Sequence, residues 1–457
     1  MAVELNSSGC ACLKSPNTND EGTVELTAEP DDHPLSIHDL PSVVLQKTLS
    51  LDVRQRLRCE LVCRSWSQQL SYSDGISFRH DFRRQNVHAD VVLRWIASRI
   101  GQNLRHLELS GRRFFISPEA VPLLEGMTSL ESISLSGFWV HTAHLLSQLP
   151  AARLQRLVLK PADESDDWLQ MGMPPGWLSR LGQLQELSLD FVPIMEQLDN
   201  PNLLRIKHEG GCCEGLDFQA IADCRNLRSL DVRSFGMHGF RNFNYVGAFV
   251  GLHHLNLVAI SLTVPLNDFT SILRCLPELR SLSFRVRELL TSETTPSIPV
   301  MRSLRHLEAC FSSSAGDFIL ESLIKGACLN SFRYDCYRHR ITLDLAKLIV
   351  EHTAEDLVNF AIIDTTFFQR EDRDCIDCGW LLLWLAEHRL WLEKLEVVVL
   401  QPAHMQRAAD IRLRYIAQGQ ALPTLHCTLW TVRGNSEDIP WKALEEARIN
   451  LILKDDV

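Results

Sequence analysis

Apolar residues recur along most of the chain as Leu-x-x-Leu-x-Leu or a close variant. Good copies span Leu104–Leu109, Leu130–Leu135, Leu154–Leu159, Leu184–Leu189, Leu227–Val232, Leu252–Leu257, Leu279–Phe284, Leu357–Ile362 and Leu392–Val397, and weaker copies begin at Leu203, Leu304, Leu329 and Leu422. The x-Leu-x-Leu part alternates with a period of two, which predicts a short strand whose leucines share one side. The thirteen copies have a mean spacing of 318/12, or 26.5 residues.

Apolar segments with helical spacing precede several of these strands, for example Val121–Met127, Phe269–Leu276 and Leu345–Val350. One strand and one helix cannot enclose a core, but stacked copies bury a continuous one. We therefore predict an α/β solenoid, with parallel strands on its concave face and helices outside. The spacing varies from 19 residues (Leu184 to Leu203) to 35 (Leu357 to Leu392), which predicts an irregular solenoid.

Over residues 104–430 this pattern resembles the leucine-rich-repeat family, whose period is ~20–29 residues. In that family the third residue after the last strand leucine is often an Asn or Cys that bonds to neighbouring turns. The corresponding positions here are Arg112, Phe138, Val192, Phe235 and Ile260. We therefore expect no such polar ladder in this chain.

A second apolar block lies ahead of the repeats. Pro41 suits the first position of a helix, and Val44, Leu45, Thr48 and Leu49 form a helical stripe behind it. The apolar side continues through Leu57, Leu61, Val62, Trp66 and Leu70. So short a block seldom folds alone, since domains below ~40 residues usually need help. The stripe must pack on the first repeats or be offered to another protein.

The same block resembles the F-box, a small three-helix domain, through Leu40-Pro41, its spaced aliphatic residues and the closing Val62-Cys-Arg-Ser-Trp66. The F-box family docks on a Skp-type adaptor, which links it to a cullin-based ubiquitin ligase. The resemblance implies that the docking side consists of Leu40, Pro41, Val44, Leu45, Leu49, Val62 and Trp66.

Charge and composition divide the remainder of the chain. Residues 1–33 hold seven acids and one lysine, so they supply −6 of the net charge of −11. They contain no aromatic residue, and we expect a disordered acidic tail. The predicted organisation is therefore the tail (1–33), the F-box (34–75), a linker with capping helices (76–103) and the repeat domain (104–457).

Composition also excludes several classes of function. The acidic balance and the lack of a basic stripe in the sequence argue against nucleic acid as a partner. The most apolar stretch, Trp380–Ala386, is too short for a membrane span, which needs ~20 residues. Fourteen cysteines without a visible export signal indicate reduced thiols, so we expect the protein in the cytoplasm or the nucleus.

The residues that flank the second leucine of each copy should face the concave surface. Candidate substrate-binding residues at these positions are His106, Glu108, Arg156, Glu186, Asp231, His254, Glu308 and Arg333. A polar wall with both signs of charge suits recognition of a polar protein segment. An aromatic cluster lies over residues 235–249 and includes Phe243 and Phe249. Its side chains could either bind a ligand or pack inside the array.

Other chemistry finds little support. Cys375 and Cys378 could supply two zinc ligands or a redox pair, but no second Cys-x-x-Cys exists to complete a four-ligand site. Phosphate-binding, serine-hydrolase and zinc-protease motifs are missing from the sequence. We therefore expect no catalytic residue, metal or cofactor, and no enzymatic activity in this chain.

These observations predict a non-catalytic substrate-recognition subunit of a Skp–cullin–F-box (SCF) ubiquitin ligase. Its F-box would dock on the adaptor, and its repeats would bind a target protein, unidentified from the sequence, for ubiquitin-dependent degradation. The alternative is a protein-binding repeat scaffold outside any ligase, with the helical block serving as a cap.

Overall fold

The computed structural model describes residues 76–82, 87–138, 149–162, 178–190, 197–210, 216–234, 241–290, 297–311, 315–336, 352, 357–364, 383, 392–400, 402–432 and 438–453. All of them belong to one unit of the chain, residues 64–457. The predicted acidic tail and the predicted F-box lie outside the described residues.

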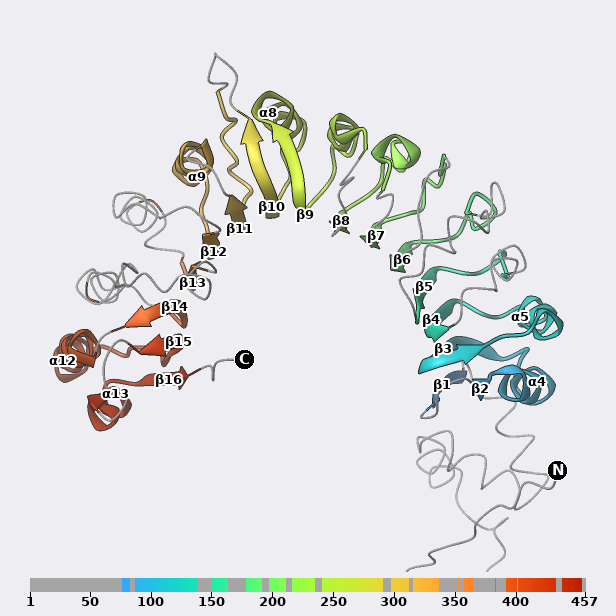
Figure 1. The fold of residues 1–457 in the computed structure, drawn as a ribbon, viewed down its shortest axis with the longest axis horizontal. Helices are drawn as coiled ribbons and strands as arrows, with labels where there is room; N and C mark the ends of the chain where they lie inside the picture. Colours follow the sequence, from blue (N-terminus) through green and yellow to red (C-terminus); the bar gives the residue numbers. More distant parts are fainter. Residues whose placement is uncertain are drawn as a thin grey trace, which may run out of the picture. The chain divides into compact units, whose positions relative to one another are not determined.

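A single parallel sheet runs through this unit, and its strands follow one another in chain order (Figure 1). One short strand, β2, pairs with β3 beside the main path. The strands are β1 (Ile76–Phe82), β2 (Val87–His88), β3 (Leu104–Phe115), β4 (Ser132–Phe138), β5 (Arg156–Pro161), β6 (Glu186–Asp190), β7 (Arg205–Gly210), β8 (Ser229–Ser234), β9 (His254–Pro265), β10 (Ser281–Leu290), β11 (His306–Phe311), β12 (Ser331–Cys336), β13 (Asn359–Asp364), β14 (Lys394–Leu400), β15 (Leu425–Val432) and β16 (Ile449–Leu453).

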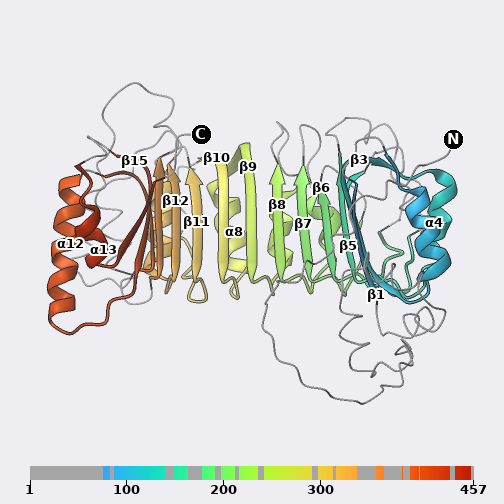
Figure 2. The same ribbon diagram turned by 90° about the horizontal axis from the view of Figure 1, so that it is seen from below.

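The helices lie on the outer side of the curved sheet, so the strands line its concave side (Figures 1 and 2). They are α4 (Asp90–Arg99), α5 (Val121–Glu125), α8 (Leu266–Cys275), α9 (Ala315–Lys325), α12 (Pro402–Ala417) and α13 (Trp441–Glu446), with 3₁₀ turns η2 (Pro118–Ala120), η4 (Phe218–Ile221) and η5 (Phe243–Ala248). The described part of the chain is therefore a leucine-rich-repeat-like solenoid, as its apolar pattern predicts.

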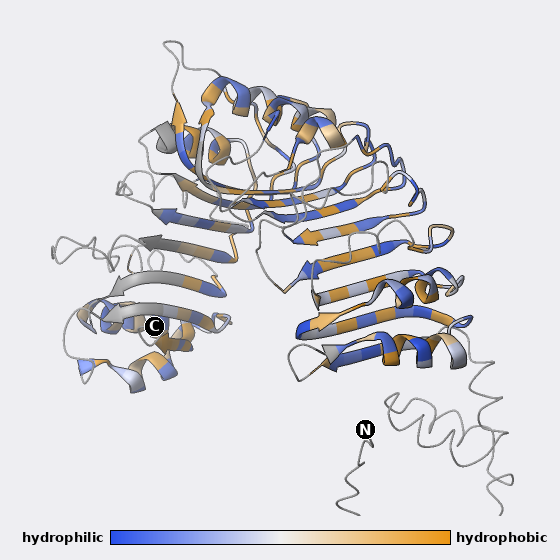
Figure 3. Ribbon diagram, turned by 45° about the vertical axis from the view of Figure 1, so that its right-hand side comes forward, coloured by the Kyte–Doolittle hydropathy of each residue, from blue (hydrophilic) through white to orange (hydrophobic). Residues whose placement is uncertain are grey.

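The core is a set of apolar columns that run across the strands. The second leucine position of each copy forms one such column, and none of its members is more than 2% exposed: Leu107, Ile133, Leu157, Leu187, Ile206, Leu230, Leu255, Leu282, Leu307, Phe332, Phe360, Leu395 and Cys427. Apolar and polar residues alternate along the strands (Figure 3). Each repeat thus buries its leucines only because a neighbour covers them.

A recurrent turn leads into many strands. The N–H of the first leucine donates to the carbonyl three residues earlier, as between Leu227 and Cys224 or between Leu279 and Leu276. Because both residues of each pair are buried, the turn satisfies backbone groups that would otherwise lack partners in the core. All four weaker copies, at Leu203, Leu304, Leu329 and Leu422, precede strands of the sheet: β7, β11, β12 and β15.

The sheet extends beyond the predicted repeats at both ends. Residues 76–103, expected as a linker with capping helices, contain helix α4 but also strands β1 and β2. The first strand pairs in parallel with β3, and its Phe78 contacts Trp95 of α4 at a ring-centroid distance of 6.1 Å. Among the described residues, β1 is therefore the first strand of the sheet, and its sequence alternates like a strand but lacks the leucines of the repeat pattern.

Polar groups do enter the core at a few places. Asn200, with no exposed surface, donates from Nδ2 to the carbonyls of Leu181 (2.9 Å) and Leu184 (3.3 Å). It therefore ties one repeat to the preceding one, at a different position from the Asn or Cys of the leucine-rich-repeat family. Phe138, at one of the family's ladder positions, is 2% exposed and belongs to the apolar core.

Two strands approach each other very closely at Gly137. This residue has φ +84°, and a Cβ placed on it would lie 1.8 Å from the carbonyl oxygen of Gly111. Only glycine fits such a contact, since any side chain would overlap the neighbouring backbone. The glycine therefore allows strand β4 to follow the irregular end of β3, where the register shifts.

Candidate protein-binding face

Two rows of side chains project from the concave side of the sheet. The first row contains the residue before the second leucine position, and the second row contains the residue after it. The structure places His106, Arg156, Glu186 and His254 in the first row, and Glu108, Asp231, Glu308 and Arg333 in the second. None of these eight predicted residues is buried, whereas the leucines between them are. The predicted positions are therefore correct, because strand alternation alone decides them.

The acidic residues of the predicted set are engaged by arginines on the same face. Glu108 pairs with Arg79 at 3.1 Å, and Glu186 pairs with Arg156 at 3.4 Å and with Arg205 at 3.1 Å. Asp231 accepts from Arg233 Nε at 3.3 Å and from Asn256 Nδ2 at 2.7 Å. These carboxylates therefore balance the positive charges around them more than they attract a ligand of their own.

Four charged residues on β10, β11 and β12 form the densest network. Arg285 pairs with Asp335 at 2.8 Å and also with Glu308, while Arg333 lies 3.4 Å from Glu308 and 3.3 Å from Asp335. Burial alone would lower the pKa of the Arg285 guanidinium. Its hydrogen bond with Glu308 and the charges of Asp335 and Glu308 outweigh burial and raise that pKa. The network thus pairs two guanidinium groups with two carboxyl groups.

A different balance holds at the amino ends of β7–β11. We define the basic rim as two positions for each of these five strands: the first-row residue, with which the strand begins, and the residue directly before it. The ten rim residues are Leu204, Arg205, Arg228, Ser229, His253, His254, Arg280, Ser281, Arg305 and His306. The ten positions hold four arginines, three histidines and no carboxylate. The positive charge is therefore concentrated at this edge, although the whole chain carries −11.

Part of the rim is compensated by neighbouring groups. Glu278, in the turn before β10, lies 3.3 Å from Arg228 and 3.2 Å from His253. Arg305 donates from Nη1 to main-chain carbonyls, including that of Cys328 at 3.1 Å. Within the described part of the chain, the side chains of Arg280 and His306 make no hydrogen bond or ion pair, and both are exposed. These two residues are thus available to a ligand.

The pKa of His254 reports the local excess of positive charge. Partial burial lowers this pKa, and His253, His306, Arg280 and Arg205 lower it further. His254 is the rim residue among the candidates predicted from the sequence. A rule that takes only the two residues flanking each second leucine cannot find the preceding residues Arg228, His253, Arg280 and Arg305. The repeated Leu-Arg-Ser, Leu-His-His and Leu-Arg-His at the start of these copies carry the signal.

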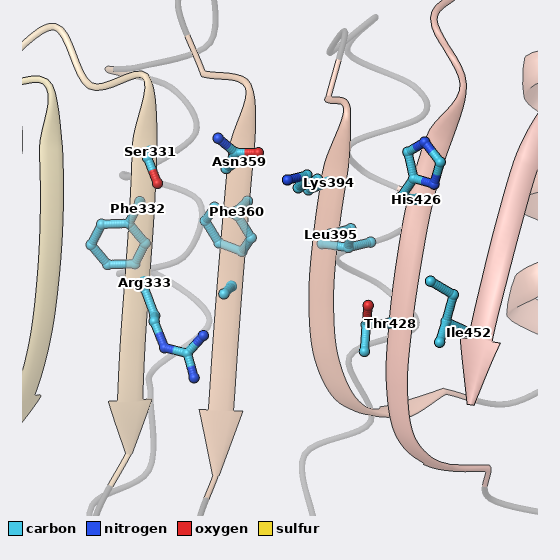
Figure 4. A pocket seen from close by; sticks show the side chains of 11 residues that line it. Ser331, Phe332, Arg333, Asn359, Phe360, Lys394, Leu395, His426, Thr428 and Ile452 are labelled. Carbon is cyan, nitrogen blue, oxygen red and sulfur yellow. The ribbon is translucent and has the colours of Figure 1, made fainter. Parts of the chain in front are cut away.

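A shallow hollow of about 510 Å³ lies on the concave side over β12–β16. In Figure 4, Ser331, Asn359, Lys394 and His426 follow one another across the strands, and Arg333, Thr428 and Ile452 lie beyond them. The lining is mixed, with hydroxyl, amide and cationic groups above the apolar side chains of Phe332, Phe360 and Leu395. It is suited to polar contacts along a chain rather than to enclosing a small molecule.

Two members of the aromatic cluster pack inside the array. Phe249 has no exposed surface, and Phe243 contacts Phe218 and Phe284 at ring-centroid distances of 6.1 and 6.4 Å. Packing inside the array, one of the two readings left open by the sequence, is therefore correct for these two residues. Tyr245, in the same cluster, is exposed.

Several predictions fall outside the described residues. These are the adaptor-docking residues Leu40 to Trp66 and the pair Cys375 and Cys378. Among the described residues, no group of three or more His, Cys, Asp or Glu is arranged to hold a metal ion. In the same part of the chain, no helix has the length and apolar character of a membrane span.

Comparison with known proteins adds little. No family model matches the chain, and no curated protein matches it. Among solved structures, the chain is similar to an internalin from Listeria monocytogenes, with a TM-score of 0.40 and 13% identity over 92% of this chain and 100% of that one. The description of this chain as a leucine-rich-repeat-like solenoid therefore stands on its own sheet and core.

Proposed function

We propose that this chain is a protein-binding repeat scaffold that holds a polar segment of another protein against its concave face. The observation that carries the proposal is the pair of polar rows over an apolar column, continued across consecutive strands of one sheet. Such a surface offers many weak, separate polar contacts, which suit the recognition of an extended chain more than that of a compact small ligand.

We further propose that the scaffold serves as the substrate-recognition subunit of an SCF-type ubiquitin ligase. The support is the sequence alone: Leu40-Pro41 and Val62-Cys-Arg-Ser-Trp66 stand at the two ends of an F-box-like apolar pattern, directly ahead of the solenoid. The chain itself would catalyse nothing. It would bring the target close to the transfer machinery of its partners and so raise the effective concentration of target lysines. The proposal implies a cytoplasmic or nuclear location.

The free energy of docking makes substitution of the docking residues a sensitive test of the ligase role. Burial of four large apolar side chains stabilises a complex by ~6–12 kcal/mol. Association costs ~4–15 kcal/mol, so these four residues hold a partner only with the help of the contacts around them. Loss of one or two of them should therefore abolish the interaction instead of weakening it slightly.

The test is co-purification of the adaptor and the cullin with the full chain. The variant Leu45→Glu/Trp66→Glu should lose both partners, whereas the concave-face variant Arg156→Glu should retain them. Circular dichroism should show the same sheet content in all three proteins, because Leu45 and Trp66 lie outside residues 76–453 and Arg156 is an exposed residue of β5. Equal recovery of the adaptor by the double variant and the parent chain would contradict the ligase role and leave a repeat scaffold outside any ligase.

A further inference from the structure

At the basic rim, carboxylates compensate only some of the positive groups: Glu186 pairs with Arg205, and Glu278 pairs with Arg228 and His253. Along most of the face, each arginine has a carboxylate within 4 Å, as Arg79 has Glu108 and Arg285 has Asp335. None of the ten rim positions itself holds a carboxylate, and the side chains of Arg280 and His306 make no ion pair within the described residues. The turns before β8, β10 and β11 add two acids, Asp223 and Glu278, and two arginines, Arg225 and Arg302.

We propose that the basic rim binds an acidic segment of the partner protein, which lies across strands β7–β11. This inference rests on the proposed protein-binding role of the concave face and names the chemistry of its partner. Charge complementarity is the basis, since the exposed Arg280 and His306 side chains have no ion-pair partner within the described residues and can each donate to a carboxylate.

The layout of the rim determines the length of the segment. Neighbouring strands lie about 4.8 Å apart, so five strands span about 19 Å. An extended peptide advances about 3.3 Å per residue, and about six residues therefore cover the rim. The cations are distributed along this line, one or two to a strand, instead of converging on one point. That spread matches several carboxylates in succession better than it matches a single phosphate group.

Protein is favoured over nucleic acid as the source of the negative charge. None of the ten rim positions holds a Phe, Tyr or Trp side chain, the large aromatic surfaces on which successive bases stack. Ser229 and Ser281 within the rim, and Asn256 beside it, are small polar groups suited to contacts with a peptide backbone. In addition, the chain as a whole carries −11, which repels a long polyanion.

Binding should be coupled to proton uptake. His254 is faced by His253 on its own strand, by His306 on β11, by Arg280 at the start of β10 and by Arg205 on β7, with Glu278 beside His253. A bound row of carboxylates would offset these positive charges and favour the protonated imidazoles. Affinity should therefore rise as the pH falls from about 7.5 to about 5.5, above the range in which glutamate itself is protonated.

The test uses the full chain and a fluorescent hexaglutamate peptide, with binding followed by fluorescence anisotropy. Arg280→Glu should weaken binding about tenfold or more, because it replaces a free cation by an anion. The matched control is Arg407→Glu, which makes the same charge change at an exposed position on helix α12. This control should bind within about twofold of the parent chain. A hexaglutamine peptide should not bind measurably.

Three outcomes would overturn the proposal. The first is equal weakening by Arg280→Glu and Arg407→Glu, which would show only a general effect of net charge. The second is tighter binding of a decathymidine strand than of hexaglutamate, which would assign the rim to nucleic acid. The third is an affinity that does not rise as the pH falls in the parent chain, or that rises equally in His254→Gln/His306→Gln.

The result is separable from the ligase role. Arg280→Glu should still co-purify with the adaptor, and Leu45→Glu/Trp66→Glu should still bind hexaglutamate. Loss of peptide binding in the first variant alone supports the rim. Loss of adaptor binding in the second variant alone supports the ligase role. Failure of one proposal can therefore be distinguished from failure of the other.

Discussion

Arg285 on β10 and Asp335 on β12 form an ion pair of 2.8 Å that reaches past the intervening strand β11. Asp335 is only 4% exposed, so its carboxylate is stabilised by its guanidinium partners and not by water. Glu308 on β11 binds the same arginine, and the pair thereby links three repeats on the concave side. A charged cluster, not an apolar contact, connects the solenoid across its concave surface here.

Removal of one member of this pair should destabilise the solenoid. Arg285→Met should lower the free energy of unfolding by about 1–3 kcal/mol, because a nearly buried carboxylate loses a charge-assisted hydrogen bond. The control is Arg79→Met, which breaks an exposed pair worth about 0–1 kcal/mol. Urea denaturation followed by circular dichroism measures both. A double-mutant cycle with Asp335→Asn should show a coupling energy of about 0.5–3 kcal/mol, and additive effects would contradict the link.

Substitution of Gly137 should be among the most damaging single-methyl changes in the sheet. Gly137→Ala places a Cβ against the Gly111 carbonyl in a left-handed backbone conformation. The strain is on the order of 1–3 kcal/mol before any overlap is counted. Gly182→Ala, where a Cβ would meet nothing within 4 Å, should change stability by less than about 0.5 kcal/mol. Thermal unfolding of the two variants makes the comparison, and equal melting temperatures would contradict the close strand approach.

Stability should depend on pH through His254. Its pKa is lowered in the folded protein, so the unfolded chain binds the proton more readily. The favourable contribution is therefore present above the unfolded pKa of about 6.5 and declines as the pH falls through that value. His254→Gln should reduce the loss of melting temperature between about pH 7.5 and about pH 5.5. Arg280→Gln should reduce it in the same direction, since it removes one of the charges that oppose protonation. An unchanged slope in both variants would contradict this assignment.

Cysteine reactivity should separate the buried thiols from the exposed ones. Burial raises the pKa of Cys224 to about 11 and that of Cys427 to about 12. Cys275 and Cys328 are exposed. Brief treatment of the folded protein with iodoacetamide at neutral pH should label the exposed pair and spare the buried pair, because the thiolate is the reactive form. Peptide mass spectrometry gives the extent of labelling at each position, and unfolding in urea should remove the difference.

Sequence periodicity was enough to predict the solenoid and the position of its polar face. Leucines at alternate positions determine which side of a strand is buried, so Glu108 and Arg333 could be assigned to the concave side without any structure. The same rule missed β1, because Ile76–Phe82 alternates without the leucine spacing that marks the other copies. The rule also did not predict the buried hydrogen bond of Asn200, since that residue has no fixed place in the repeat pattern.

What only the tertiary structure decided is which charges meet. Arg285 and Asp335 are 50 residues apart in the chain, and Arg205 and His306 are 101 apart, yet parallel stacking places each pair within one small region of the sheet. In the sequence the arginines and histidines of the rim are separated by acidic residues, and the chain shows no basic stripe. Because the strands stack in register, residues at the same position of successive repeats become neighbours. Their charges combine into a network of ion pairs in one place and into a basic rim in another. Electrostatic interactions depend on these distances in space, so a pattern read along the chain cannot supply them.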